Sequence, residues 1–168
     1  HMEQGLKSVA WPARMQRLGP GVLSNYIPKD AELWLDGGHN PSAGRVIARA
    51  FSEINDRHSR PLVLIWGMLN SKDAGRFIEA FAGLAQRVVA LAIPGEPNAV
   101  PADQLAGAAR AHNLPAETAA SLTKALEQAS LIRPTPRILV CGSLYLAGHV
   151  LSIHENSPMS GVSGAARR

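Results

Sequence analysis

The sequence predicts an α/β domain built on a mostly parallel, open sheet with helices on both faces. Apolar runs of strand length alternate with amphipathic stretches of helix length through the central hundred residues, which is typical of crossover units in a parallel sheet. The apolar runs are continuous, which indicates strands that are covered on both faces. With 168 residues, 46% of them hydrophobic and 18% charged, the chain has the size and composition of one domain with one core.

Each expected strand is an apolar run bounded by proline, glycine or charged residues: Glu32–Asp36, Leu62–Trp66, Arg87–Ile93 and Arg137–Cys141. The expected helices follow these strands or lie between them: Ala43–Ile54, Ala74–Leu84, Ala102–Ala111, Leu122–Ala129 and Leu144–Ile153. Serine hydroxyls can accept from the unpaired amides of a first helical turn, so three serines are expected to be N-caps: Ser42, Ser71 and Ser121.

The chain is expected to have four parts. Residues 1–2 resemble the remnant of a cleaved expression tag, and residues 3–30 form a turn-rich N-terminal segment with short edge strands around Met15–Leu18 and Val22–Tyr26. Residues 31–155 form the α/β domain itself. Residues 156–168 are rich in Ser, Gly, Ala and Arg without periodicity, and they are expected to form a flexible tail.

Charge and composition exclude several classes of function. The net charge of +4 arises from 17 basic and 13 acidic residues without a basic run, so nucleic acid is not an expected partner. The longest apolar stretch, Leu62–Leu69, is too short to cross a membrane. The single cysteine, Cys141, cannot form an internal disulfide and is expected to be buried and unreactive, which favours a reducing cytoplasm. We expect the protein to act as a monomer on small molecules.

Three loops at the ends of expected strands carry the polar residues of a candidate site. The segment Asp36–Ser42 (Asp-Gly-Gly-His-Asn-Pro-Ser) joins a strand to a helix, and so does Gly142-Ser143. The third loop runs from Gly67 to Lys72-Asp73, which are possible contacts to a phosphate or carboxylate. The carboxyl ends of parallel strands meet at one edge of a sheet, where ligands of open α/β sheets bind. Each loop alone is also consistent with an ordinary turn or, for Ser143, with helix capping.

Other features of the sequence offer no site. The remaining histidines lack metal-ligand spacing and are expected to be surface or helix residues: His58, His112, His149 and His154. No metal site is expected, and Trp11 and Trp66 are expected to be packing residues. Neither a Gly-x-x-x-x-Gly-Lys-Ser/Thr phosphate loop nor a Gly-x-Gly-x-x-Gly fingerprint is present, so a complete nucleotide site is not expected in this chain.

Four motifs occur in order: Trp-Pro-Ala-Arg-Met-Gln at 11–16, Leu-Asp-Gly-Gly-His-Asn-Pro at 35–41, Gly-Met-Leu at 67–69 with Lys72-Asp73, and Cys-Gly-Ser-Leu-Tyr-Leu-Ala-Gly at 141–148. Together they resemble the C-terminal domain of bifunctional dihydrofolate synthase and folylpolyglutamate synthase, a relative of the Mur ligases. The resemblance covers roughly residues 8–154 and implies a Rossmann-like fold of the Mur ligase C-terminal type. It departs from the family at two positions, since the family usually has Gly where Ala13 stands and Ala where Gly38 stands.

The resemblance also implies an activity, namely addition of L-glutamate to dihydropteroate or a folate through an acyl phosphate. The full-length enzyme would use ATP and Mg²⁺, with the phosphate loop and metal ligands on an N-terminal ATPase domain outside this chain. Arg14 would bind the ATP phosphates and, with His39, act in catalysis, while Asp36 would hold the ATP ribose or position the nucleotide. His39 and Ser143 would hold the incoming glutamate. The chain alone is therefore expected to be inactive.

Two other interpretations remain open. The chain could be a free-standing Rossmann-like module that binds a nucleotide or an anion. It could also be a hydrolase with Ser143, His39 and Asp36 as a nucleophilic triad, although the Gly-x-Ser-x-Gly elbow is lacking and Asp36 is only three residues from His39.

Overall fold

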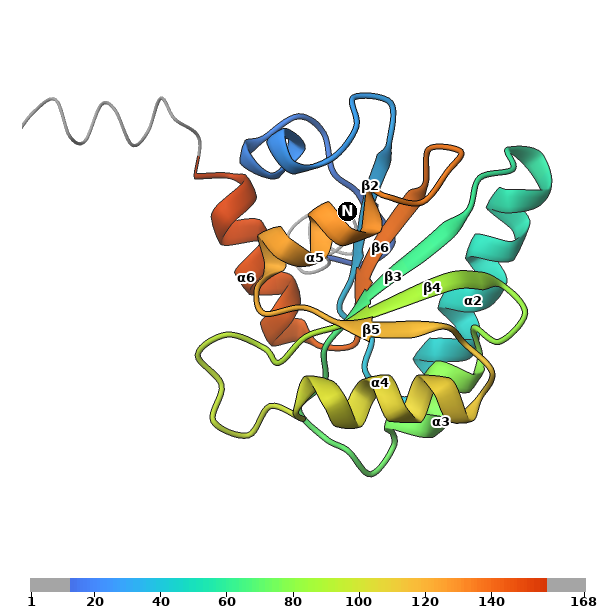
Figure 1. Cartoon of the computed structure of the whole chain (residues 1–168), viewed down its shortest axis with the longest axis vertical. Coiled ribbons are helices and arrows are strands. Elements are labelled where there is room, and N and C mark those ends of the chain that lie inside the picture. The colour runs from blue at the N-terminus through green and yellow to red at the C-terminus, as the bar shows by residue number, and fades with distance from the viewer. Residues whose placement is uncertain (1–12, 157–168) are drawn as a thin grey trace, which may run out of the picture.

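The computed structural model describes residues 13–156. The expectations for the tag remnant, Trp11 and residues 157–168 of the tail lie outside the described residues. In the described part, strands form one sheet in the order β1-β2-β6-β3-β4-β5 (Figure 1): β1 Gln16–Arg17, β2 Glu32–Asp36, β3 Leu62–Trp66, β4 Ala85–Ala90, β5 Ala116–Thr118 and β6 Arg137–Cys141. Only β1 pairs in antiparallel fashion within this sheet. The mostly parallel, Rossmann-like α/β fold is thus confirmed.

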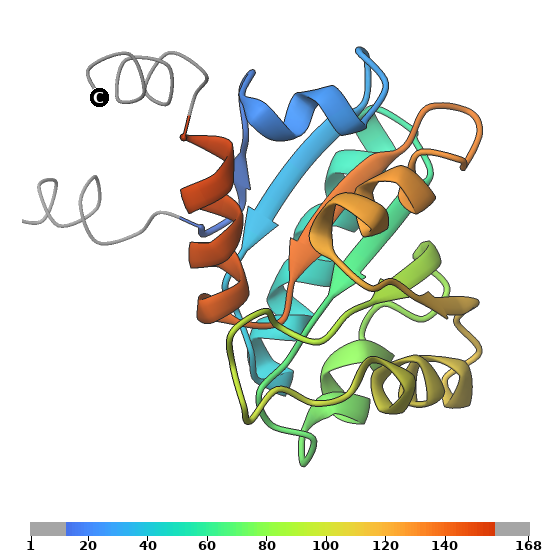
Figure 2. The same cartoon turned by 60° about the vertical axis from the view of Figure 1, so that its left-hand side comes forward.

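Helices cover both faces of the sheet. The helices are the 3-10 helix η1 Val22–Tyr26 and α2 Pro41–Arg57, α3 Ala74–Glu79, α4 Ala102–Ala111, α5 Leu122–Ala129 and α6 Leu144–His154. Figures 1 and 2 agree that α2, α3 and α4 lie on one face, whereas η1, α5 and α6 lie on the other. The helices also join the strands in chain order, so that each parallel connection crosses over one face of the sheet.

Two apolar cores, one on each face, explain why the central strands are apolar throughout. Along β3, Leu64 and Trp66 belong to the core under α2, α3 and α4, whereas Val63 and Ile65 belong to the core under η1, α5 and α6. All five β3 residues are buried. Because successive side chains of a strand point to opposite faces, a sheet covered on both sides needs apolar residues at every position.

Several element boundaries differ from expectation. Val22–Tyr26 is a 3-10 helix and not an edge strand: the amide of Gly21 donates to the Ser24 hydroxyl at 3.1 Å, and Leu23 is buried. Helix α3 ends at Glu79, short of Leu84, and β4 starts earlier and ends earlier than expected. Strand β5 was not expected, because its three residues are partly exposed and carry no apolar run.

The N-caps were predicted correctly at one helix of three. The hydroxyl of Ser121 accepts from the amide of Lys124 at 3.2 Å. At α2 the cap is Asn40, whose Oδ1 accepts from the amide of Ala43 at 2.8 Å, because Pro41 already occupies the first helical position. At α3 the cap residue is Asp73, so the prediction for Ser71 was wrong.

His154 is a helix residue, one of the two positions expected for it, and it is also buried. His154 ends α6 and is only 5% exposed. Its Nε2 lies 2.6 Å from the carbonyl oxygen of Gly19, and its Nδ1 accepts from the amide of Leu23 at 3.3 Å. These two contacts fit the tautomer that carries its proton on Nε2. The ring therefore ties the last helix to the N-terminal segment, a long-range contact that residue spacing does not reveal.

Candidate functional site

The three predicted loops meet because three strands end level with one another. In the sheet register, Asp36 of β2 lies opposite Cys141 of β6, and Cys141 lies opposite Trp66 of β3. The loops that begin at Gly37, Gly142 and Gly67 therefore leave the same edge side by side. This is the carboxyl edge of the parallel strands, where open α/β sheets bind ligands.

Gly142 allows the loop after β6 to lie close to the loop after β3. Its φ is 110°, and a Cβ at this position would lie 2.2 Å from the carbonyl oxygen of Gly67. Only glycine fits such a backbone without strain. The loops after β6 and β3 can therefore touch directly, which brings Ser143 near the residues that follow β3.

Asp36 joins the loop after β2 to the N-terminal segment. Its Oδ1 accepts from the amide of Gly38 at 2.7 Å, and its Oδ2 accepts from the amide of Met15 at 2.9 Å. The amide of Gly37 adds a bond to the carbonyl oxygen of Ala13 at 2.6 Å. Asp36 is buried by these contacts, while Arg14, between Ala13 and Met15, is exposed at the edge of the site.

His39 and Asn40 complete the loop after β2. Both are exposed, and His39 Nδ1 lies 3.3 Å from the carbonyl oxygen of Gly37. The side chain of Asn40 caps α2, and Pro41 has no N–H, so few amides of this helix start remain available for an anion. An anion at this edge would consequently depend on side chains such as those of Arg14 and His39.

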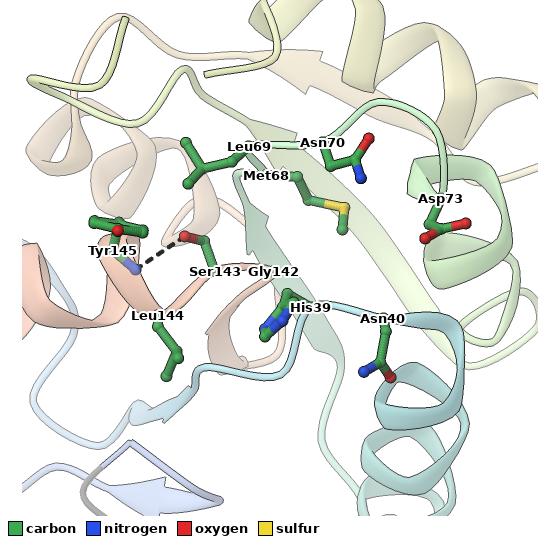
Figure 3. A pocket seen from close by; sticks show the side chains of 10 residues that line it. All are labelled: His39, Asn40, Met68, Leu69, Asn70, Asp73, Gly142, Ser143, Leu144 and Tyr145. Atoms are coloured by element: carbon green, nitrogen blue, oxygen red, sulfur yellow. Dashed lines mark hydrogen bonds between the residues drawn. The ribbon is translucent and has the colours of Figure 1, made fainter. Parts of the chain in front are cut away.

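Ser143 is the buried N-cap of α6. Its hydroxyl accepts from the amides of Tyr145 at 2.9 Å and Leu146 at 3.3 Å, and the first of these bonds is drawn in Figure 3. The capping function expected as the simpler alternative is therefore present. The hydroxyl proton is not used by these two bonds, so the group can still donate to a ligand.

Lys72 and Asp73 have different surroundings in the structure. Lys72 is exposed, and its amide donates to Asn70 Oδ1 at 2.9 Å. Asp73 is half-buried and is the cap residue of α3, but its side chain makes no capping bond. Its carboxylate instead lines a cavity together with His39 and Ser143.

Two cavities open at this edge and share His39, Asn40 and Leu144 in their walls. The first has a volume of about 290 Å³ and lies between the three loops. Figure 3 shows His39 and Asn40 facing Met68 and Asp73, with Ser143 to Tyr145 on the third side. The second has a volume of about 480 Å³ and is lined by Arg14, Asp36, the glycine pair and α2. The structure thus brings Arg14, Asp36, His39, Ser143 and Asp73 together, whereas Lys72 lines neither cavity.

The geometry does not assemble a hydrolytic triad or reactive thiol. Asp36 bonds to backbone amides, and among residues 13–156 no hydrogen bond joins His39 to Ser143 or to Asp36. Complete burial, with a smaller effect of the Asp36 charge, raises the pKa of the Cys141 thiol far above its usual range, so the expectation of an unreactive thiol is supported. Over the same range there is no cluster of three or more His, Cys, Asp or Glu that could hold a metal ion.

Several lining residues were not predicted from the sequence as site residues. Met68 and Tyr145 line the first cavity, and Leu144 and Asn40 line both. The signal for Asn40 was available, since asparagine before a proline at the first helical position is a typical N-cap. Met68, Leu144 and Tyr145 stand within the motifs that carry the resemblance, but their residue types alone do not point to binding chemistry. No helix within residues 13–156 is both long and apolar enough to cross a membrane.

The chain is similar to known proteins over most of its length. The family model described as Mur ligase, glutamate ligase domain, matches residues 14–144. The folylpolyglutamate synthase of Lacticaseibacillus casei is 28% identical over 150 residues, which cover 89% of this chain and 31% of that protein. The chain thus spans about a third of the length of that relative.

Solved structures share the fold. Folylpolyglutamate synthase of Mycobacterium tuberculosis, complexed with ADP and AMPPCP, superposes with a TM-score of 0.67 at 24% identity, over 88% of this chain and 33% of that chain. The bifunctional folylpolyglutamate synthase/dihydrofolate synthase of Yersinia pestis, complexed with AMPPNP and an Mn ion, gives 0.65 at 24% identity, over 89% and 32%.

Proposed function

Because the chain belongs to the Mur ligase family as a glutamate ligase domain, we propose that it is the C-terminal domain of an ATP-dependent ligase. The ligase adds L-glutamate to dihydropteroate, to tetrahydrofolate or to both, in the cytoplasm. The observation that carries the proposal is the pair of cavities that share His39 at one sheet edge. Two neighbouring cavities suit a reaction in which a phosphorylated carboxylate meets an amine.

The chemistry has two steps. The terminal phosphoryl group of ATP moves to a carboxylate of the pterin substrate, which yields ADP and an acyl phosphate. The amino group of glutamate then attacks the acyl carbon, the amide forms and phosphate leaves. An acyl phosphate hydrolyses easily, so it should form only when the site is closed and the amine is in place.

The residues of this chain divide between the two cavities. Arg14 and Asp36 make up the nucleotide side, since a guanidinium suits the charge that develops on transferred phosphate. His39 and Ser143 make up the glutamate side, where a ring nitrogen and a hydroxyl can donate to a carboxylate. His39 lines both cavities and so stands where acyl phosphate and amine would meet.

Exposed apolar side chains support a second wall from another domain. Val46, Leu144 and Tyr145 are 67%, 60% and 59% exposed, and all three border the cavities. Large apolar side chains gathered beside a cleft are typical of a surface that a partner covers. We assign this partner as the N-terminal ATPase domain of the same enzyme, and we place the phosphate loop and the Mg²⁺ ligands on it.

ATP-dependent incorporation of labelled L-glutamate tests the proposal, with dihydropteroate and tetrahydrofolate as separate acceptors. We expect no incorporation by the isolated chain, and reduced incorporation by the full-length ligase with Arg14→Ala, Asp36→Ala or His39→Ala. His58→Ala is the matched control, because His58 is exposed at the end of α2 and lines neither cavity. Wild-type rates in all three site variants, or robust incorporation by the isolated chain, would refute the assignment.

A free-standing nucleotide- or anion-binding module is the second candidate. It is favoured by one observation, namely that three loops of this chain already form a cavity of about 290 Å³ between them. Calorimetry of the isolated chain with ATP and ADP separates the two functions. We expect weak binding, and tight binding without glutamate incorporation by the full-length protein would favour the module.

A further inference from the structure

The backbone on either side of Arg14 has an unusual conformation. Ala13 and Met15 have φ values of 67° and 47°, in the left-handed region that residues with a Cβ rarely adopt. Such conformations persist where surrounding contacts determine them, and they cluster at functional sites. The exposed Arg14 stands between the two.

Four hydrogen bonds hold this conformation, and we call this set the Arg14 clamp. Asp36 accepts from Met15 at 2.9 Å and from Gly38 at 2.7 Å. The amide of Gly37 donates to the carbonyl oxygen of Ala13 at 2.6 Å. The Oε1 atom of Gln16 accepts from the amide of Ala13 at 2.6 Å. The backbone is thus fastened on both sides of Arg14, and three of the four bonds come from Asp36 and Gly37.

We propose that Asp36 is a positioning residue for Arg14, with Gln16 as its second support. Each Asp36 oxygen is already engaged by a backbone amide, one from the N-terminal segment and one from its own loop. The carboxylate therefore links the two segments and sets the direction in which Arg14 leaves the sheet edge. A cation whose backbone is fixed in advance loses less conformational entropy when it binds phosphate. The clamp itself stands on the geometry, and its consequence for catalysis rests on the proposed function.

Limited proteolysis of the 168-residue chain tests the clamp without any enzymatic assay. Asp36→Asn leaves one oxygen for two amides and turns an NH₂ group toward a donor. Trypsin is expected to cut the Arg14–Met15 bond at least about tenfold faster in Asp36→Asn, because a lost bond to a charged group is worth that factor or more. Cleavage after Arg57, at the end of α2, is expected to stay unchanged. Asp56→Asn is the matched control, since Asp56 is exposed on α2.

A second pair of variants covers the case in which Asp36→Asn unfolds the chain. Gln16→Leu removes the acceptor for the Ala13 amide, and Gln16→Glu retains it. We expect faster cleavage after Arg14 in the first and wild-type cleavage in the second. Equal cleavage rates in the wild type, Asp36→Asn and Gln16→Leu would overturn the clamp.

The full-length ligase tests whether Asp36 acts through Arg14. Asp36→Asn is expected to lower kcat/KM for ATP by about tenfold. In an Arg14→Ala background the same substitution should cost less than about twofold, because the positioned group is gone. Equal losses in both backgrounds would overturn the positioning role. An inactive wild-type ligase would refute the proposed function while leaving the proteolysis result to judge the clamp.

Discussion

Glu32→Gln tests the buried ion pair at the amino-terminal edge of the sheet. Glu32 Oε1 accepts from Arg137 Nε at 2.7 Å and from Trp34 Nε1 at 2.9 Å. Glu32 Oε2 accepts from Arg137 Nη2 at 3.3 Å and lies 3.4 Å from Arg60 Nε. Arg137 is 1% exposed, so a neutral partner at position 32 would leave its guanidinium buried without a counter-charge.

The size of the loss follows from the pKa of Glu32. Burial alone raises this pKa, but hydrogen bonds from Arg137 and Trp34 and the charges of Arg137 and Arg17 outweigh it and lower the pKa from 4.5 to about 2. A difference of about 2.5 pKa units corresponds to about 3 kcal/mol of unfolding free energy. Removing one partner of a buried pair costs about 3 to 5 kcal/mol in other proteins, which agrees. The pair therefore stabilises the fold above pH 4.5, and this stabilisation is lost as the pH falls toward 2.

Urea unfolding followed by circular dichroism at pH 7 measures the loss. Glu117→Gln is the matched control, because the Arg87–Glu117 pair is of similar length, 2.8 Å, but its side chains are 40% and 32% exposed. Such a pair is worth at most about 1 kcal/mol. A thermal melt should show Glu32→Gln about 6 to 12 °C below the wild type.

Two results would refute the reasoning about Glu32. The first is a Glu32→Gln loss that does not exceed the Glu117→Gln loss. The second is a difference between wild type and Glu32→Gln that stays constant from pH 5 to pH 2, since protonation of Glu32 should make the two proteins alike.

Three further substitutions test the architecture around the site. Gly142→Ala should lower the free energy of unfolding in urea by about 2 to 5 kcal/mol, because the new Cβ would lie 2.2 Å from a backbone carbonyl oxygen and φ is 110°. Gly148→Ala is the control, since Gly148 faces open space on α6, and it should be neutral or stabilising. Equal effects of the two substitutions would contradict the close approach at Gly142. His154→Leu should cost about 1 to 3 kcal/mol, since it leaves the buried amide of Leu23 without an acceptor and removes the contact to the carbonyl oxygen of Gly19. A melting temperature within error of the wild type would contradict this role of His154. Ser143→Ala and Ser121→Ala should each lower the free energy of unfolding by about 1 kcal/mol, because each removes an N-cap. Only Ser143→Ala should raise the KM for glutamate in the full-length ligase. Equal KM values in the two variants would show that Ser143 acts only as a cap.

The core of the fold could be predicted because its signals are local. Strands Glu32–Asp36, Leu62–Trp66 and Arg137–Cys141 and helices Ala102–Ala111 and Leu122–Ala129 have the bounds that the sequence predicted. These segments are long, apolar on the faces that pack, and bounded by turn residues.

Strand β5 and the burial of His154 have a different cause. Strand β5 exists because three residues find a partner in β4, and His154 is buried because α6 ends beside the N-terminal segment. Both depend on contacts between distant parts of the chain, which periodicity does not report. The 3-10 helix at Val22–Tyr26 likewise depends on packing of Leu23 into the core.

The polar residues of the candidate site could be predicted from the sequence, but not all of their hydrogen-bond partners could. The sequence placed Asp36, His39 and Ser143 at one sheet edge because Asp36 ends a strand and the other two follow strands, and the strand ends do lie level in the sheet. Capping of α6 by Ser143 was one of the alternatives that the sequence offered, whereas the bond between Asp36 and the amide of Met15 could not be predicted from residue type. Hydrogen-bond partners are set by the relative position of two segments, and this is a tertiary property.

The antiparallel pairing of β1 with β2 has a mechanical consequence. Because β1 runs against the other strands, residue 13 lies at the edge where the cavities open, and a domain attached through this segment would turn about a point beside the site. Strand β5 lies five interstrand spacings from β1, about 24 Å, whereas β2 lies at one. A rotation about an axis along β1 would therefore carry β5 about five times as far as β2, which ends in Asp36. Under such a rotation, Arg14 and the residues beside it would be displaced much less than the far edge of the sheet.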